Sequence, residues 1–229
     1  MPLGVGICLS LLALPFAILI VIGARFLSRS RRWGFALTGT IVSLVIGVLS
    51  ILGLLGWTVG LVIAGIAFFA IAFAALAGGA YHGLVDLFDE TILAPLFQAS
   101  LVSIGVSNFL LVIAVLNVTA PKQNRRTWII ILAIKLLVYL LWVARSTDFR
   151  AAICDYAVTL AMILWVARTG PPAFARPLRA GILVSLAASA VQVGHVAPAA
   201  SFNHNDLYHV MQIGAVVLFH RAFVRATPR

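Results

Sequence analysis

The sequence predicts an all-α protein, a polytopic bundle of seven to eight transmembrane helices. Of its 229 residues, 63% are hydrophobic and only 10% are charged, whereas soluble domains carry roughly 25% charged residues. Eight apolar runs approach or exceed the roughly 20 residues that a helix needs to cross the hydrocarbon core of a bilayer. This composition excludes a soluble globular protein and leaves no room for a separate folded domain.

The apolar runs divide the chain into a single integral membrane domain, 1–229. They span residues 3–27, 34–55, 57–80, 92–118, 128–144, 150–168, 179–198 and 206–224. Run 3–27 is followed by arginines instead of being preceded by basic residues, the reverse of a cleavable signal peptide. We therefore expect a retained N-terminal span at 3–27 and a seven-helix core over about 34–225.

The breaks between runs carry the residues expected of turns. Gly170, Pro171, Pro172 and Pro177 predict a loop that is not helical throughout, so that the seventh span begins near residue 179. Tryptophan lies near several run ends, as an interfacial aromatic belt requires. These tryptophans are Trp33, Trp57, Trp128, Trp142 and Trp165.

The formal charge of +10 arises from 16 Lys and Arg against 6 Asp and Glu. Most basic residues occupy short loops, where they can contact lipid headgroups, so we expect membrane lipids as partners and no nucleic acid. Strict alternation of the spans places the 81–91 and 199–206 loops on the same face. Neither loop contains Lys or Arg, and together they carry the acidic residues Asp86, Asp89, Glu90 and Asp206.

A polar stripe runs along the last span. Asn205 and His209 are four residues apart, and Gln212 follows one turn later, so the three side chains lie on one side of a helix. Asn205 or Asp206 is suited to cap the helix. We therefore expect this helix to begin at one of these two residues, with His204 in the preceding turn. Capping combined with an interfacial histidine is the simpler interpretation.

The more specific interpretation is a metal site. A catalytic zinc ion takes three protein ligands and one open position for water, and His82, His204 and His209 supply three imidazoles on one face. Asp86 or Asp89 would then act as a base on the metal-bound water. The same cavity would be lined by Tyr81, Ser103, Asn205, Asp206 and Gln212.

Two segments carry a resemblance to a known superfamily. The Gly-Gly-Ala-Tyr-His stretch at 78–82, followed by Leu-Phe-Asp-Glu at 87–90, resembles segments of alkaline ceramidases. The Asp-Leu-Tyr-His-Val stretch at 206–210 resembles the start of the seventh helix in those enzymes and in the progestin and adipoQ receptors. The resemblance implies a divergent member of the CREST superfamily of membrane hydrolases, with seven helices and a zinc ion held by three histidines.

The resemblance also implies roles for individual residues. His82 and His209 match two of the zinc ligands, and Asp89 matches the aspartate near the metal. Where the family has His-x-x-x-His, this chain has Asn205-x-x-x-His209, and His204 is displaced by one residue. We therefore expect His204 to be the third ligand, since a neutral amide is a poor partner for zinc.

Three functions remain open from the sequence. The leading hypothesis is a zinc-dependent intramembrane hydrolase of a lipid amide or ester. The first alternative is a receptor or transporter that uses the same cavity as a ligand or proton site, and the second is a haem-binding electron carrier. All three predict that His82 and His209 approach each other in the fold.

Other polar residues in the spans have structural and functional interpretations. Lys135 lies in mid-span and Asp155 is placed to reach it, as a structural pair or as part of a pathway. His195 is either a further member of the polar cluster or a satisfied core histidine, and the core position is slightly favoured. Serines and an asparagine on the fourth span either face the cavity or, as is commoner, make hydrogen bonds between helices. They are Ser100, Ser103, Ser107 and Asn108.

Overall fold

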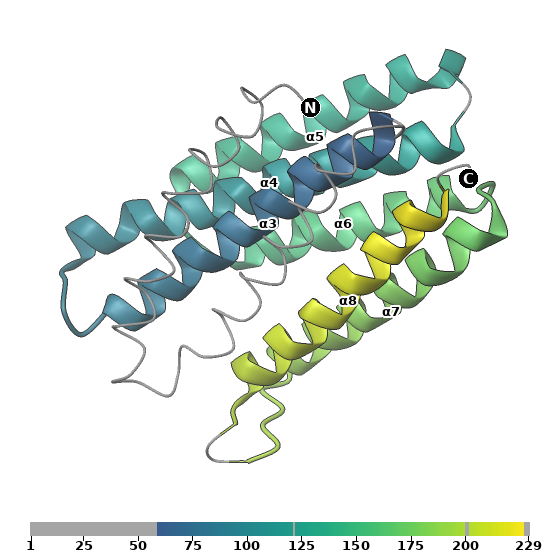
Figure 1. The fold of residues 1–229 in the computed structure, drawn as a ribbon. Coiled ribbons are helices and arrows are strands. Elements are labelled where there is room, and N and C mark those ends of the chain that lie inside the picture. Colours follow the sequence, from purple (N-terminus) through teal and green to yellow (C-terminus); the bar gives the residue numbers. More distant parts are fainter. Residues whose placement is uncertain (1–58, 121, 200–201, 227–229) are drawn as a thin grey trace, which may run out of the picture.

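The computed structural model describes residues 59–120, 122–199 and 202–226. These residues form six α-helices and no strand. The helices are α3 (Val59–Leu84), α4 (Glu90–Thr119), α5 (Lys122–Arg145), α6 (Arg150–Ala167), α7 (Pro172–Val193) and α8 (His204–Ala226). Successive helices run in alternating directions along a common axis (Figure 1).

Two groups of helices build the bundle. Helix α4 contacts α3, α5 and α6, and α7 packs along α8 as a hairpin. Contacts of α3 with α8 and of α6 with α7 join the two groups. The main hydrophobic core lies between them and contains large, almost fully buried side chains, including those of Phe68, Leu111, Ile163, Phe174, Ile182, Phe219 and Phe223.

Small residues permit the close approach of neighbouring helices. A Cβ atom at Gly181 of α7 would lie 2.7 Å from the Phe219 ring of α8, and one at Gly105 of α4 would lie 2.4 Å from the Tyr139 ring of α5. On α3, the small residues Ala64, Ala67 and Ala74 are buried. The rings therefore occupy space that any other residue at these glycines would fill.

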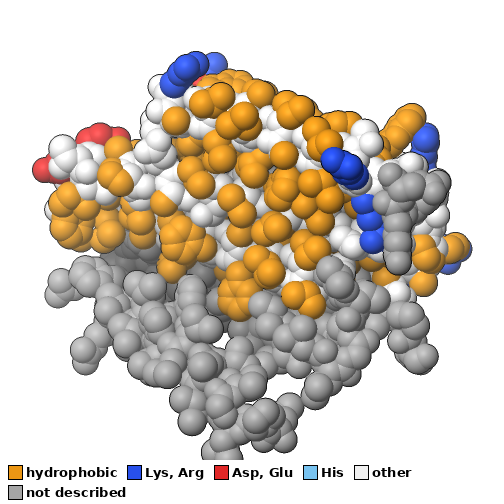
Figure 2. Space-filling model, turned by 90° about the horizontal axis from the view of Figure 1, so that it is seen from above, with side chains coloured by type: hydrophobic (Ala, Val, Ile, Leu, Met, Phe, Trp, Pro, Cys, Tyr) orange, Lys and Arg blue, Asp and Glu red, His pale blue; other side chains and the backbone are white. Residues whose placement is uncertain are grey.

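All six helices are long and apolar enough to cross a membrane. Their outward faces keep large apolar side chains exposed, most visibly on α5, where Ile130, Ile134 and Val138 are each more than half exposed. Apolar side chains cover much of the described surface in Figure 2. Such faces are compatible with contact to lipid. The expected spans 3–27 and 34–55 lie outside the described residues.

The seventh expected span is displaced along the sequence. It begins at Pro172 and ends at Val193, so the prediction of a loop reaching residue 178 is wrong. Proline is accommodated at the first helical position because no N–H is needed there, and the Pro171 carbonyl accepts hydrogen bonds from the backbone N–H groups of Phe174 and Ala175. The early start is stabilised because it buries the Phe174 side chain in the core.

Alternation brings three connections to one end of the bundle, here called the α3–α4 end: residues 85–89, 146–149 and 194–203 (Figure 1). The 81–91 and 199–206 loops therefore share an end, as the sequence predicts. The acidic side chains visible in Figure 2 gather mainly at one end. Lys122, Arg125, Arg126, Arg168, Arg176 and Arg179 flank the connections at the opposite end.

Candidate functional site

His82 and His209 come from two helices that meet at the α3–α4 end. His82 lies in the last turn of α3, and His209 lies in the second turn of α8. Helices α3 and α8 contact each other, so the two histidines lie on neighbouring elements. The structure places these histidines, 127 positions apart, at the same end of the bundle, and their approach within reach of a shared ion stays a prediction. The His82 ring is exposed, whereas His209 is partly buried.

The aromatic residue beside His82 packs against α4. The rings of Tyr81 and Phe97 have centroids 4.7 Å apart, and Tyr81 and His82 contact edge to face at 5.1 Å. The Phe97 ring also lies 6.4 Å from that of His82. Tyr81, expected to line a cavity, thus holds the end of α3 against α4.

Helix α8 begins at His204, one residue earlier than the first of the two starts that the sequence predicts. The cap is Asn203, whose Oδ1 accepts hydrogen bonds from the backbone N–H groups of Asn205 and Asp206 at 2.8 and 3.2 Å. The Asp206 carboxylate in turn accepts the N–H of Asn203 at 3.0 Å. This reciprocal arrangement is a capping box. The expectation that Asn205 or Asp206 is the cap and that His204 precedes the helix is wrong, because Asn203 satisfies the first free N–H groups.

His204 contacts a different histidine from the two proposed as its co-ligands. Its Nε2 lies 3.3 Å from Nδ1 of His195. His195 is exposed in the turn after α7, so the interpretation of this residue as a core histidine on the seventh span is wrong. Within the described residues, no three His, Cys, Asp or Glu side chains are grouped to hold a metal ion.

The two aspartates expected to act as bases lie at the surface. Asp86 is exposed in the turn after α3, and Asp89 is exposed at the cap position of α4, where it accepts a hydrogen bond from the Thr91 hydroxyl. No ion pair or hydrogen bond joins either carboxylate to a histidine among the described residues. Both are therefore placed as exposed surface charges.

Ser103 and Ser100 use their hydroxyls on backbone carbonyls. Ser103 donates to Ala99 of its own helix at 2.8 Å, and Ser100 donates across the helix contact to Ala74 of α3 at 2.8 Å. Both bonds follow the common pattern for serine in membrane helices. Asn205 contributes its backbone N–H to the capping box.

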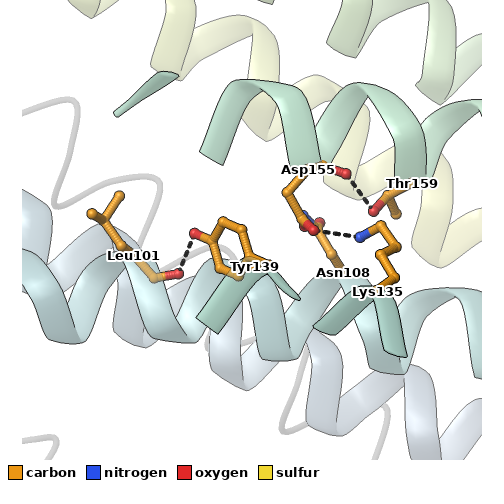
Figure 3. A network of polar contacts seen from close by, with 6 residues as sticks. All are labelled: Leu101, Asn108, Lys135, Tyr139, Asp155 and Thr159. Carbon is orange, nitrogen blue, oxygen red and sulfur yellow. Dashed lines mark hydrogen bonds and ion pairs between the residues drawn. The ribbon is translucent and has the colours of Figure 1, made fainter. Parts of the chain in front are cut away.

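A charged network lies inside the bundle between α4, α5 and α6 (Figure 3). Lys135 Nζ is 2.6 Å from Asp155 Oδ1, and Asn108 Nδ2 donates to Asp155 Oδ2 at 2.7 Å. The Asp155 side chain is only 4% exposed. Beside it, Thr159 donates to the Asp155 carbonyl and Tyr139 donates to the Leu101 carbonyl. The structure thus confirms the contact between Lys135 and Asp155.

A second, uncharged network lies on the other side of α6. The Tyr156 hydroxyl donates to Ser185 Oγ of α7 at 2.8 Å, and Gln212 Oε1 of α8 lies 3.4 Å from the Tyr156 hydroxyl and 3.3 Å from Ser185 Oγ. Gln212 therefore faces α6 and α7.

Sequence reasoning missed Tyr156 and Asn203. Tyr156 directly follows Asp155, so its position beside an ionisable residue in an apolar run is a usable signal. Asn203 precedes Asp206 by three positions, the spacing of a capping box, and that pattern was available.

Comparison with known families adds one result. The model of the DUF6962 family, described as a family of unknown function, matches residues 36–228. The chain belongs to the DUF6962 family. The DUF6962 match includes all six described helices and both polar networks. No curated protein and no solved structure matches the chain significantly.

Proposed function

We propose that the protein is a multi-pass integral membrane transporter that moves protons along the polar side chains between its helices. The observation that carries this proposal is the buried contact between Lys135 and Asp155. A charged side chain at bilayer depth costs roughly 2.5–3.5 kcal/mol on insertion scales, and such groups commonly mark ion or proton pathways. A transporter is therefore favoured over hydrolysis, with its charged pair between α5 and α6 and not in the histidine cavity that the sequence suggested.

The two polar networks flank the same turn of α6. Asp155 contacts α4 and α5, and the next residue, Tyr156, contacts α7 and α8. Successive residues of a helix point about 100° apart, so one turn of α6 presents polar groups to both halves of the bundle. Because Gln212 lies on α8, the series extends from α6 through α7 to α8.

The ionisable and hydroxyl side chains in this series are able to pass a proton. Transfer from the Lys135 ammonium to the Asp155 carboxylate leaves a neutral amine and a neutral carboxylic acid, and the reverse transfer restores the pair. The hydroxyls of Tyr156 and Ser185 each donate and accept hydrogen bonds. Because Asn108 holds the second carboxylate oxygen, Asp155 keeps one partner when Lys135 releases it.

Proton flux in liposomes tests the proposal. The full chain is reconstituted with a pH-sensitive dye inside, and a potassium diffusion potential is applied with valinomycin. We expect faster acidification than in empty liposomes, and loss of most of this flux in Asp155→Asn. Ser100→Ala is the matched control, since it removes a buried hydrogen bond to Ala74 outside the series. Flux equal to that of empty liposomes, or wild-type flux in a folded Asp155→Asn variant, would contradict the proposal.

A lipid amide or ester hydrolase is the second candidate, favoured by the placement of His82 and His209 at the same end of the bundle. The described residues do not fit the implied three-histidine zinc centre, because the His204 ring lies against His195. To test this candidate, zinc content and hydrolysis of a fluorescent lipid amide are measured for the wild type and for His209→Ala. An absorption spectrum of the same preparations shows whether haem is bound. Zinc and activity that both depend on His209 would establish this candidate instead.

A further inference from the structure

His195 and His204 form a histidine pair at the α3–α4 end of the bundle. The two rings meet edge to face, with centroids 4.6 Å apart and planes at 77°. The closest ring nitrogens are Nδ1 of His195 and Nε2 of His204, separated by 3.3 Å. His195 is exposed and His204 is half-buried, so the pair is accessible to an ion from water.

The backbone at His195 has an unusual conformation. Its φ angle is 50°, the only positive value of a non-glycine residue in the described part of the chain. The Val196 N–H bonds to the Val191 carbonyl at 3.1 Å, which is the longer hydrogen bond of a Schellman motif. Glycine usually occupies the left-handed position of this motif, yet here Gly194 precedes that position and His195 fills it.

His204 is held from the other side of the loop. It is the first residue of α8, directly after Asn203, which caps the helix. Ala199 and Phe202 exchange backbone hydrogen bonds, of 3.4 and 3.1 Å, and so draw together the two sides of the connection. The Schellman turn and the capping box thus fix both backbones from which the rings project.

We propose that His195 and His204 chelate one divalent transition-metal ion of the zinc class, through Nδ1 and Nε2 respectively, with water at the remaining positions. Two nitrogen ligands at 2.0–2.1 Å from a tetrahedral zinc ion lie about 3.3–3.4 Å apart. The observed separation of 3.3 Å matches this value. Imidazole suits zinc, copper and nickel. The proposal explains why histidine stands where glycine would be less strained.

Zinc titration of the full chain in detergent, prepared without a polyhistidine tag, tests the site. We expect one bound Zn²⁺, and a loss of affinity of about tenfold or more in His195→Asn and in His204→Gln. Asparagine tolerates the left-handed conformation, so His195→Asn removes the ligand and keeps the turn. His195→Gly is a second variant that relieves the backbone and is also expected to lose the ion.

Two further variants separate this site from other histidines. His220 lies at the far end of α8, so the His220→Gln variant should bind Zn²⁺ as the wild type does. His209→Gln should also retain binding, whereas a three-histidine site that includes His209 would lose it. The proposal is overturned when wild type binds no Zn²⁺ at micromolar concentrations, when folded His195→Asn binds as wild type does, or when His209→Gln abolishes binding. Proton flux is measured separately, so either proposal can fail alone.

Discussion

Lys135 Nζ and Asp155 Oδ1 lie 2.6 Å apart and connect α5 to α6 inside the bundle. Asn108 occupies the other carboxylate oxygen, so one aspartate joins three helices. Because the Asp155 side chain is almost completely buried, its charge depends on these partners and not on water.

Removal of one partner of this pair should be strongly destabilising. Lys135→Met leaves the Asp155 carboxylate without its cation, and we expect a loss of about 3–5 kcal/mol in the free energy of unfolding. The double variant Lys135→Met/Asp155→Leu should recover much of this loss, because no unpaired charge remains. Denaturant unfolding in detergent micelles, followed by circular dichroism, measures both. Equal stability of the two variants would argue against a charged pair.

The contact of Gly181 with Phe219 should not tolerate a methyl group. A Cβ at Gly181 would also lie 3.2 Å from the Ala215 carbonyl, so we expect Gly181→Ala to cost about 1–3 kcal/mol. Gly214→Ala on α8 is the matched control, since its Cβ would meet nothing within 4 Å. That change should stabilise the helix by about 0.5–1 kcal/mol. The melting temperatures of the two variants should therefore shift in opposite directions from that of the wild type.

Loss of the Asn203 cap should loosen the start of α8. We expect Asn203→Ala to cost about 0.5–2 kcal/mol, because the N–H groups of Asn205 and Asp206 lose their acceptor. Asn203→Asp retains an acceptor oxygen and should remain close to wild type. Hydrogen exchange of the first turn of α8 is the measurement. Unchanged protection in Asn203→Ala would show that the side chain does not cap the helix.

The left-handed conformation of His195 should have a measurable cost. In metal-free buffer, His195→Gly is expected to be more stable than His195→Ala by about 1 kcal/mol, since only alanine retains the steric strain. Both variants lack the imidazole, so the comparison isolates the backbone. A lower melting temperature for His195→Gly than for His195→Ala would contradict the positive φ angle.

The uncharged network should contribute less than the ion pair. Tyr156→Phe removes one hydroxyl that contacts Ser185 and Gln212, and we expect a cost of about 1 kcal/mol. Ser189→Ala, which removes a hydroxyl bonded only to the Ser185 carbonyl of its own helix, is a suitable control. Equal unfolding free energies of these two variants would show that the contact between helices adds nothing.

The sequence by itself determined that the protein is a bundle of apolar helices and which connections lie at the same end of it. Length and hydropathy of the apolar runs set the six described helices, since every backbone polar group in lipid must be satisfied within the helix. Alternation alone placed His82 and His209 at one end. It also made Lys135 and Asp155 reachable partners, because an unpaired charge in a span is too costly to leave.

Only the tertiary structure decided which polar side chains meet. Packing of Phe174 into the core moved the start of α7 to Pro172, and this shift placed His195 beyond the helix and against His204. The packing of α8 decided that Gln212 meets Tyr156 and Ser185. Periodicity gives the angle between side chains on one helix but not the direction in which that helix faces. That direction follows from the packing of all neighbouring helices together, which no local pattern encodes.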